Sequence, residues 1–296
     1  MKIKIKRTGL CGLFPVVLLA ALTTACIKED LSKCTVPYTF VVRAYDASGQ
    51  ELSTGEVADV TLCVFNGRSL YSVTNIDAQV GEAVTVEVPD DDDIHVVGWG
   101  NLGGGSQHCV RPNPGDHLDY CRVSLIPQTR AVVFALPPDD LFRGTVIVPK
   151  ADRQGEKILP IRREVGSMTV TVRNLPGTGG DYQVVVHETP SSIDFYGGLG
   201  GDKVGYRPCG SLATHNAREE YCVAPFNLLP DEDGMRIEVY RDEQLLAAVS
   251  NDSGGNLIVV RKDRLTNVLI DLGGDGNLSV SMSITDWGEQ QMWKEF

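Results

Sequence analysis

The sequence predicts an all-β protein made of β-sandwich domains. Short segments that alternate apolar and polar side chains recur from about residue 38 to the C-terminus. Turn residues separate these segments, and the chain of 296 residues contains 31 glycines and 15 prolines. Many short strands at turn-punctuated intervals are typical of sandwiches and barrels.

The first half of the chain carries most of these expected strands. The pair Asn66-Gly67 lies between two β-rich segments and predicts a hairpin. The expected strands are Tyr38–Tyr45, Asp59–Phe65, Ser69–Thr74, Ala83–Val88, Ile94–Gly100, Tyr120–Ile126, Ala131–Leu136 and Thr145–Val148.

The composition changes near residues 149–158, "PKADRQGEKI", and this change suggests a domain boundary. We therefore expect an N-terminal sandwich at 37–155 and a C-terminal sandwich at 156–296. Only Pro137–Phe142 and Leu212–Tyr221 could hold a short helix. The expected strands of the second domain are Ser167–Arg173, Tyr182–His187, Met235–Tyr240, Gln244–Val249, Leu257–Arg261, Asn267–Leu272 and Leu278–Ile284.

Residues 1–25 have the three zones of a secretory signal peptide. Met1–Arg7 carries four cations and no acid, Leu10–Leu22 is mostly apolar, and Thr23–Ala25 is small. The apolar zone is shorter than the roughly 20 residues that span a bilayer. A buried helix of the mature fold is the alternative. We expect residues 1–25 to be removed.

Cys26 follows the small residues directly and resembles the acylated cysteine of a bacterial lipobox. The usual leucine lies one position further away, at Leu22, with Thr23 in its place. Several acyl chains would hold the protein on a bilayer, since each buried methylene contributes about 0.8 kcal/mol. The alternative is ordinary signal cleavage with Cys26 as a structural cysteine. Residues 26–36 would form a lipidated tether.

Lys28, Glu29 and Asp30 follow the cysteine and resemble the surface-export signal of Bacteroidota lipoproteins. The alternative is a solvated charged linker. Removal of residues 1–25 leaves 23 Lys and Arg against 39 Asp and Glu, a net charge of −16. A chain this acidic does not neutralise phosphates, so we expect no nucleic-acid partner.

No catalytic motif is present, so we expect no enzyme and no cofactor. The sequence lacks G-x-S-x-G, H-E-x-x-H and a P-loop. The acids at 89–93 diverge along an extended chain, so we expect no metal there. Trp99, Trp287 and Trp293 are most simply packing residues, with carbohydrate stacking as the alternative.

Six cysteines remain after Cys11 and Cys26 are set aside. An even number in an exported chain predicts disulfides, although six cysteines allow fifteen pairings. Two pairs are close in sequence, Cys109 with Cys121 and Cys209 with Cys222, which leaves Cys34 with Cys63. A zinc site is the rival interpretation, but no C-x-x-C pair exists.

Four segments together resemble the FimB/Mfa2-like fimbrial anchor family of Bacteroidales lipoproteins. The first, "CIKEDLSKC" at Cys26–Cys34, is similar to the start of the mature anchors. The others are "RREVGSMTVTVRNLPG" at Arg162–Gly177, "SIDFYGG" at Ser192–Gly198 and "SMSITDW" at Ser281–Trp287. The resemblance covers the whole mature chain.

The resemblance implies two tandem transthyretin-like or immunoglobulin-like sandwiches and a role as the base subunit of a fimbria. Acyl groups (palmitate among them) on Cys26 would fix the protein in the outer membrane, exposed at the cell surface. It would hold a fimbrial stalk subunit by β-strand complementation, limit fimbrial length and serve cell adhesion.

The expected subunit-contact strand is the last one, with Leu278, Val280, Met282 and Ile284 on one face. The alternative is a strand paired only within its own sheet. A surface glycan-binding lipoprotein is the rival function, and exposed aromatic platforms would distinguish it.

Overall fold

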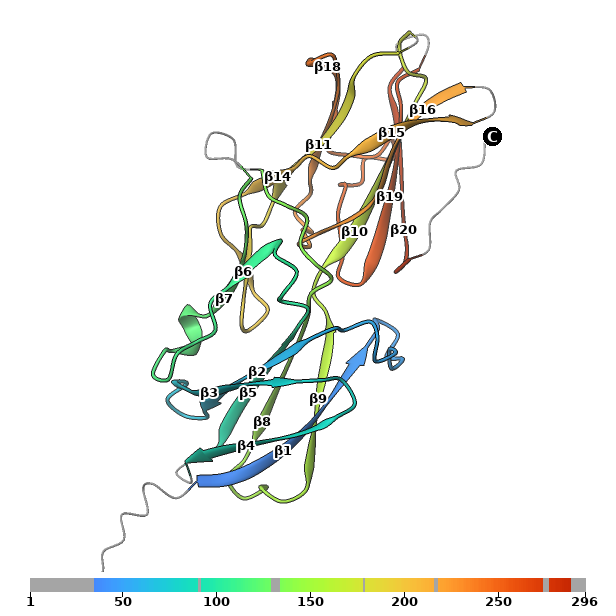
Figure 1. The fold of residues 1–296 in the computed structure, drawn as a ribbon. Helices are drawn as coiled ribbons and strands as arrows, with labels where there is room; N and C mark the ends of the chain where they lie inside the picture. The colour runs from blue at the N-terminus through green and yellow to red at the C-terminus, as the bar shows by residue number, and fades with distance from the viewer. Residues whose placement is uncertain are drawn as a thin grey trace, which may run out of the picture.

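The computed structural model describes residues 35–89, 92–128, 134–177, 179–215, 218–273 and 277–288. Nearly all elements of this part of the chain are strands, and its one helical element is the 3-10 turn η2 (Leu118–Tyr120). The prediction of an all-β fold is confirmed. The molecule is elongated, with β1 at the lower end and the sheets that follow β9 in the upper half (Figure 1).

The N-terminal half is built on one seven-stranded sheet with the order β3-β2-β5-β8-β9-β1-β4. The strands that come first and last along the chain, β1 and β9, pair in parallel. Phe40, Leu62 and Ile161 are among the fully buried core residues of this sheet. The edge strands β3 and β4 approach each other to within 8 Å between Cα atoms, so the sheet curls round its own core. The strands are β1 (Thr35–Tyr45), β2 (Val60–Asn66), β3 (Ser72–Ala78), β4 (Ala83–Pro89), β5 (Ile94–Gly100), β8 (Phe142–Val148) and β9 (Glu156–Arg163).

The C-terminal half is a sandwich of two sheets. One has the order β15-β16-β10-β19-β20 and the other β14-β11-β17-β18. Apolar side chains from both sheets, such as Val170, Val184 and Val268, share one core cluster. The strands are β10 (Gly166–Arg173), β11 (Tyr182–Thr189), β14 (Val204–Tyr206), β15 (Gly210–His215), β16 (Arg218–Leu228), β17 (Arg236–Arg241), β18 (Gln244–Val249), β19 (Arg264–Asp271) and β20 (Ser279–Asp286).

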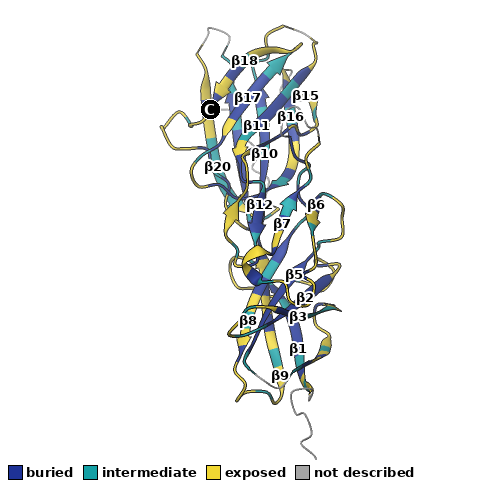
Figure 2. Cartoon of the chain, turned by 90° about the vertical axis from the view of Figure 1, so that its left-hand side faces the viewer, coloured by how far each residue is buried: buried dark blue, intermediate teal, exposed yellow. Residues whose placement is uncertain are grey.

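A small fourth sheet is made of strands from both halves. It has the order β13-β12-β7-β6, with β6 (Gln107–Cys109) and β7 (Arg122–Leu125) from the first half and β12 (Ser192–Asp194) and β13 (Leu199–Gly200) from the second. Behind it, Phe195 packs against Phe65 and Trp99, with ring centroids 6.3 and 5.6 Å apart. Figure 2 shows buried residues running through this region, so one core joins the halves.

Two expectations from the sequence are corrected by the strand pattern. Neither proposed helical segment is helical where it is described: residues 212–215 and 218–221 pair as parts of β15 and β16, and residues 137–141 have no regular secondary structure before β8 begins at Phe142. The composition change at 149–158 marks the turn between β8 and β9, and β9 pairs with β1 and β8 of the first sheet. The change of sheet therefore falls at residues 164–165 and not at 155/156.

Candidate functional site

The last strand, β20, is an edge strand of the five-stranded sheet. It pairs with β19 without a register shift from Arg264↔Asp286 to Asp271↔Ser279. On its other side, the Val280 N–H donates to Ser253 Oγ and the Val280 carbonyl accepts from the Ser253 N–H, both at 2.8 Å. The main-chain groups of Val280 therefore point away from β19.

The same direction repeats at every second residue of an antiparallel strand. The N–H and C=O groups of Met282 and Ile284 consequently point away from β19 as well. No other described strand pairs with this side of β20, and the hydrogen bonds of Ser253 to it are at Val280. The outer edge of β20, defined here as the main-chain groups of Met282 and Ile284, can accept another strand.

The four apolar residues expected on this strand differ in burial. Val280 is buried in the sandwich core, Met282 and Ile284 are half-buried, and Leu278 is 46% exposed. Met282 packs against the core cluster. Of the face expected for subunit contact, Val280 and Met282 are therefore committed to the protein's own core, while the edge of the strand remains unpaired among the described residues.

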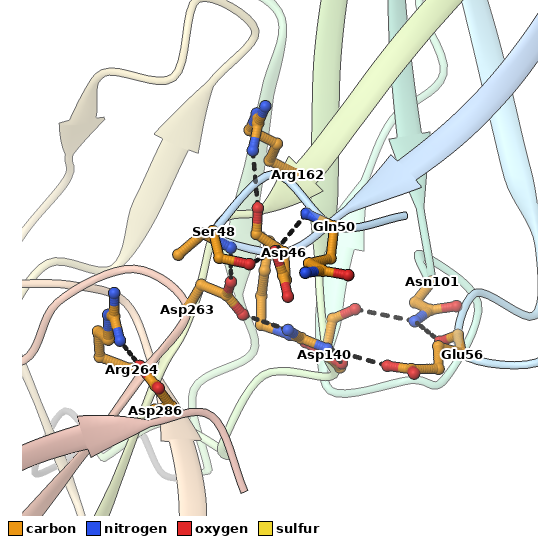
Figure 3. Close-up of polar contacts among 12 residues, drawn as sticks. Asp46, Ser48, Gln50, Glu56, Asn101, Asp140, Arg162, Asp263, Arg264 and Asp286 are labelled. Atoms are coloured by element: carbon orange, nitrogen blue, oxygen red, sulfur yellow. Dashed lines mark hydrogen bonds and ion pairs between the residues drawn. The ribbon is translucent and has the colours of Figure 1, made fainter. Parts of the chain in front are cut away.

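The end of β20 leads to a buried charge cluster where the two halves meet. Arg163, the last residue of β9, has a side chain that is only 2% exposed. Its Nε and Nη2 donate to the two oxygens of Asp140, at 2.6 and 2.9 Å, and its Nη1 donates to Asp263. Glu56 lies 3.5 Å from Nη2. Figure 3 shows these acids converging from different segments.

Two aromatic rings enclose the same guanidinium. The Arg163 carbon Cζ lies 4.1 Å from the ring centroid of Trp287 and 4.8 Å from that of Phe142. Burial lowers the pKa of Arg163, but the Asp140 and Asp263 carboxylates outweigh this effect and raise it. The guanidinium is therefore charged, and it ties residues before β8 and after β20 together. We call Arg163, Asp140, Asp263, Glu56 and Trp287 the junction cluster.

Further polar contacts cross the same boundary. Asp263 also accepts the Ala47 N–H, and Glu164 accepts from Arg143 Nε at 2.8 Å and from Lys262. Beside them lies a cavity of about 270 Å³. Its lining comes from both halves: Asp46, Ala47, Ser48, Leu52, Glu56, Arg163, Asp263, Arg264, Asp286 and Trp287. The paired and enclosed arginine makes this a structural junction.

The lipidation and export residues lie outside the described residues. This applies to Cys26, Lys28, Glu29, Asp30 and Cys34, so their roles stay predictions. Trp293 also lies outside this part of the chain. Trp99 is fully buried, and Trp287 covers Arg163, so both are packing residues as expected.

The five cysteines within the described ranges are free thiols, and the disulfides stay a prediction. Burial, then the neighbouring charge of Cys121, raises the pKa of Cys109 to about 11. Burial, then the charges of Cys109 and Cys121, raises the pKa of Cys63. The structure thus brings three thiols together where the sequence paired two. Cys222 lies opposite Ser211, two residues from Cys209.

Metal sites and membrane-spanning helices were searched for within the described ranges. There, no group of three His, Cys, Asp or Glu side chains is arranged to hold a metal ion. None of the helical segments there has the length and apolar character needed to cross a membrane.

The junction cluster was missed by sequence reasoning, although a signal existed. In β9, Leu159, Ile161 and Arg163 share one face, and the first two are fully buried. An arginine on the inward face of an alternating strand predicts a buried ion pair. Its partners Asp140 and Asp263 are distant in sequence, so the pairing itself could not be predicted.

The outer edge of β20 has no partner strand among the described residues, and comparisons with known proteins identify the family of the chain. The family model of fimbrillin-A associated anchor proteins Mfa1 and Mfa2 matches residues 31–293. The chain therefore belongs to this family, which is one of anchor proteins and not of enzymes.

Individual relatives support the same assignment. The major fimbrium anchoring subunit FimB of Porphyromonas gingivalis, strain W83, is 26% identical over 309 residues, covering 95% of this chain and 96% of its own. The solved structure of the fimbrial anchor protein Mfa2 from P. gingivalis superimposes with a TM-score of 0.61 at 15% identity, covering 86% of this chain and 98% of its own. The fold is thus that of a fimbrial anchor, and such relatives imply a place at the cell envelope.

Proposed function

We propose that this protein is the lipid-anchored base subunit of a fimbria, joined to the stalk subunit through the outer edge of β20. The observation that carries the proposal is this unpaired edge at the end of a chain that belongs to the anchor family. In β-strand complementation, a strand of one subunit extends the sheet of another, and main-chain hydrogen bonds provide the affinity.

The described contacts suit this mechanism. The partner strand would bond to the N–H and C=O groups of Met282 and Ile284, while the β19 ladder holds β20 from behind. Ser253 occupies the outer side at Val280 and would set where the added strand begins. Half-buried Met282 and Ile284 would then lose their remaining exposure to water, which adds apolar burial to the hydrogen bonds.

The arrangement of the molecule suits a protein that carries tension. The proposed lipid attachment at Cys26 precedes β1, whereas β20 lies in the opposite half (Figure 1). A pull between these ends passes along the backbone at residues 164–165, where β9 leads into β10, and the junction cluster and the shared β7–β12 pairing brace this connection. Both contacts are therefore expected to hold the halves together under load.

Membrane attachment would come from acyl chains on Cys26, and Lys28, Glu29 and Asp30 would direct the lipoprotein to the surface. Several chains anchor a protein far more firmly than one, because the free energies of burying their methylenes add. A base subunit fixed in this way would retain the fimbria on the outer membrane and end its growth.

The test is a Cys26→Ala strain compared with its parent and with a Cys209→Ala strain. Cys209 is an exposed thiol outside the proposed lipid site, so it controls for the loss of a cysteine. We expect fimbriae in the medium, detached and longer, only for Cys26→Ala. Unchanged fimbriae together with weaker binding of a surface polysaccharide would replace the anchor proposal with the glycan-binding one.

A further inference from the structure

Three tyrosines and a histidine form an exposed aromatic surface at the side of the small shared sheet. Tyr120 is 79% exposed, Tyr71 51% and Tyr196 47%. The rings of Tyr71 and His117 meet edge to face with centroids 5.1 Å apart, and His117 lies 6.1 Å from Tyr120. We call these four residues the tyrosine patch. The η2 turn that carries Tyr120 projects from the side of the molecule (Figure 1).

The patch is held in place by the backbone beneath it. The Leu118 N–H donates to the Leu70 carbonyl at 2.9 Å, and the Ser72 N–H donates to the Asp116 carbonyl at 2.7 Å. These bonds fix Tyr71 beside His117. The Tyr196 hydroxyl donates to Asp119 at 2.8 Å, so the second half of the chain adds its own ring. The rings are therefore presented in a fixed arrangement without being used in the core.

A hollow beside the rings supplies polar groups. Its volume is about 310 Å³, at the lower end of the roughly 300–1,000 Å³ of small-molecule pockets. His117 Nδ1 accepts the Asp119 N–H at 3.3 Å, while its Nε2 has no hydrogen-bond partner among the described residues. The lining consists of His108, Val110, Pro112, Asp116, His117, Tyr120, Cys121, Arg122 and Ser124.

We propose that the tyrosine patch and this hollow bind a neutral hexose unit of a glycan. A pyranose ring has a face of C–H groups, which stacks on an aromatic ring, and a rim of hydroxyls, which bond to carboxylate, imidazole and guanidinium groups. The hollow offers both kinds of contact within the space of about one sugar ring. The whole chain carries a net charge of −12, which disfavours polyanionic glycans.

A protein partner fits these features less well. Stable protein interfaces cover roughly 800 Å² on each side, whereas this surface consists of four side chains, of which His117 and Tyr120 line one hollow. The sugar site is independent of the anchor function, because it lies on the η2 side and does not involve β20. A fimbrial base with such a site would also hold a carbohydrate of the cell surface or its surroundings.

The proposal is tested by affinity electrophoresis of the full chain in native gels that contain dextran, yeast mannan or laminarin, three neutral hexose polymers. We expect at least one polymer to retard the protein. The variants Tyr120→Ala and Tyr71→Ala are each expected to weaken the association about tenfold, the equivalent of one stacking contact. Tyr120→Phe keeps the ring and is expected to bind as the parent does.

Tyr45→Ala is the matched control, since it removes a partly exposed tyrosine of β1 outside the patch and is expected to leave retardation unchanged. The absence of retardation in all three polymers would overturn the proposal. Equal retardation of the parent and both alanine variants would overturn the assignment to this patch. Loss of co-purifying stalk subunit in Tyr120→Ala, without any sugar binding, would make the patch a protein contact instead.

Discussion

The two halves of the molecule begin with the same arrangement and end differently. In the first half β1 pairs in parallel with β9 and antiparallel with β4; in the second, β10 pairs in parallel with β19 and antiparallel with β16. Beyond β9, the sheet continues through β8 to β5, β2 and β3. Beyond β19, it continues only to β20.

This difference shows how one sheet pattern can serve two purposes. In the first half, seven strands curl round the core, and the edge strands β3 and β4 approach each other. The second half stops one strand beyond the parallel pair, which leaves the outer edge of β20 unpaired among the described strands. Exposed edges are usually blocked because they promote aggregation, and the proposed addition of a partner strand would block this one.

The largest expected effect is the loss of the charge that joins the halves. Arg163→Ala leaves Asp140 and Asp263 close together without their cation, and removing one partner of a buried ion pair costs about 3–5 kcal/mol. We expect the free energy of unfolding, measured in urea, to fall by this amount. Arg162→Ala, which removes the exposed neighbour, is the control. A fall below about 1 kcal/mol for Arg163→Ala would show that the halves do not depend on the junction cluster.

The second prediction compares a closed strand with an open one by proline substitution. Val96 of β5 pairs with β2 on one side and with β8 on the other. Whichever of these strands accepts its N–H, proline at this position removes that one ladder hydrogen bond. We expect Val96→Pro to cost about 3 kcal/mol or more from the orphaned acceptor and lost packing. The Ile284 N–H points outward, so Ile284→Pro should differ from Ile284→Ala by less than about 1 kcal/mol in urea unfolding.

Binding to the stalk subunit, unlike stability, should differ clearly between Ile284→Pro and Ile284→Ala. Ile284→Pro removes an outward donor and is expected to lower the amount of stalk subunit that co-purifies, whereas Ile284→Ala keeps this donor and serves as its matched control. If Ile284→Pro unfolds the protein as Val96→Pro does, the β20 edge is already paired. If the two Ile284 variants capture equal amounts of stalk subunit, the added strand binds elsewhere.

The sequence predicted the strands better than their partners. Alternation placed Ala83–Val88 and Ser167–Arg173 within one residue of β4 and β10, because each strand has one face in the core. The parallel pairs β1–β9 and β10–β19 join segments about 100 residues apart, and no local pattern encodes such a choice. Of the shared sheet, only β7 was predicted, within Tyr120–Ile126, because β6, β12 and β13 have three residues or fewer and are too brief for alternation to show.

The sequence also predicted only part of the candidate site, because it shows where a strand lies but not which strands are its neighbours. The last strand was correctly placed, since Leu278–Ile284 alternates, but its position at a sheet edge depends on the whole topology. Tyr120 is three residues from His117 in sequence, but Tyr71 is 46 residues away and only the fold brings it to the same imidazole. Exposure of an aromatic ring is likewise a property of the folded surface that composition does not reveal.

A smaller effect is expected where β20 leads to the junction cluster. Trp287 stacks on Arg163 at 4.1 Å, and Trp287→Ala should lower the free energy of unfolding by about 1–2 kcal/mol through the lost cation–π contact. Trp287→Phe keeps an aromatic face and should lose less than half of this amount. Equal losses in both variants, measured by urea unfolding, would mean that an aromatic face over the Arg163 cation does not contribute to stability.

The smallest expected effect uses acid to test one carboxylate of the second half. Glu238 of β17 accepts from Tyr240 Oη at 2.7 Å and lies 2.8 Å from His187 Nε2 on β11. Burial raises the pKa of Glu238, but the bonds to Tyr240 and His187 and the charge of Arg236 outweigh it and lower this pKa.

Because the folded state favours the carboxylate, the stabilisation by Glu238 is present above its pKa in the unfolded chain. It is lost as the pH falls through its pKa in the folded protein. Between about pH 6 and pH 3, the parent should lose about 0.2–1 kcal/mol more unfolding free energy than Glu238→Gln, the range of surface ion pairs, because the partners His187 and Arg236 are partly exposed. Tyr240→Phe, which removes one of the lowering bonds, should fall between the two. Parallel pH curves for the parent and Glu238→Gln would show that this carboxylate does not hold β11 to β17, and that the open half owes its stability to its apolar core.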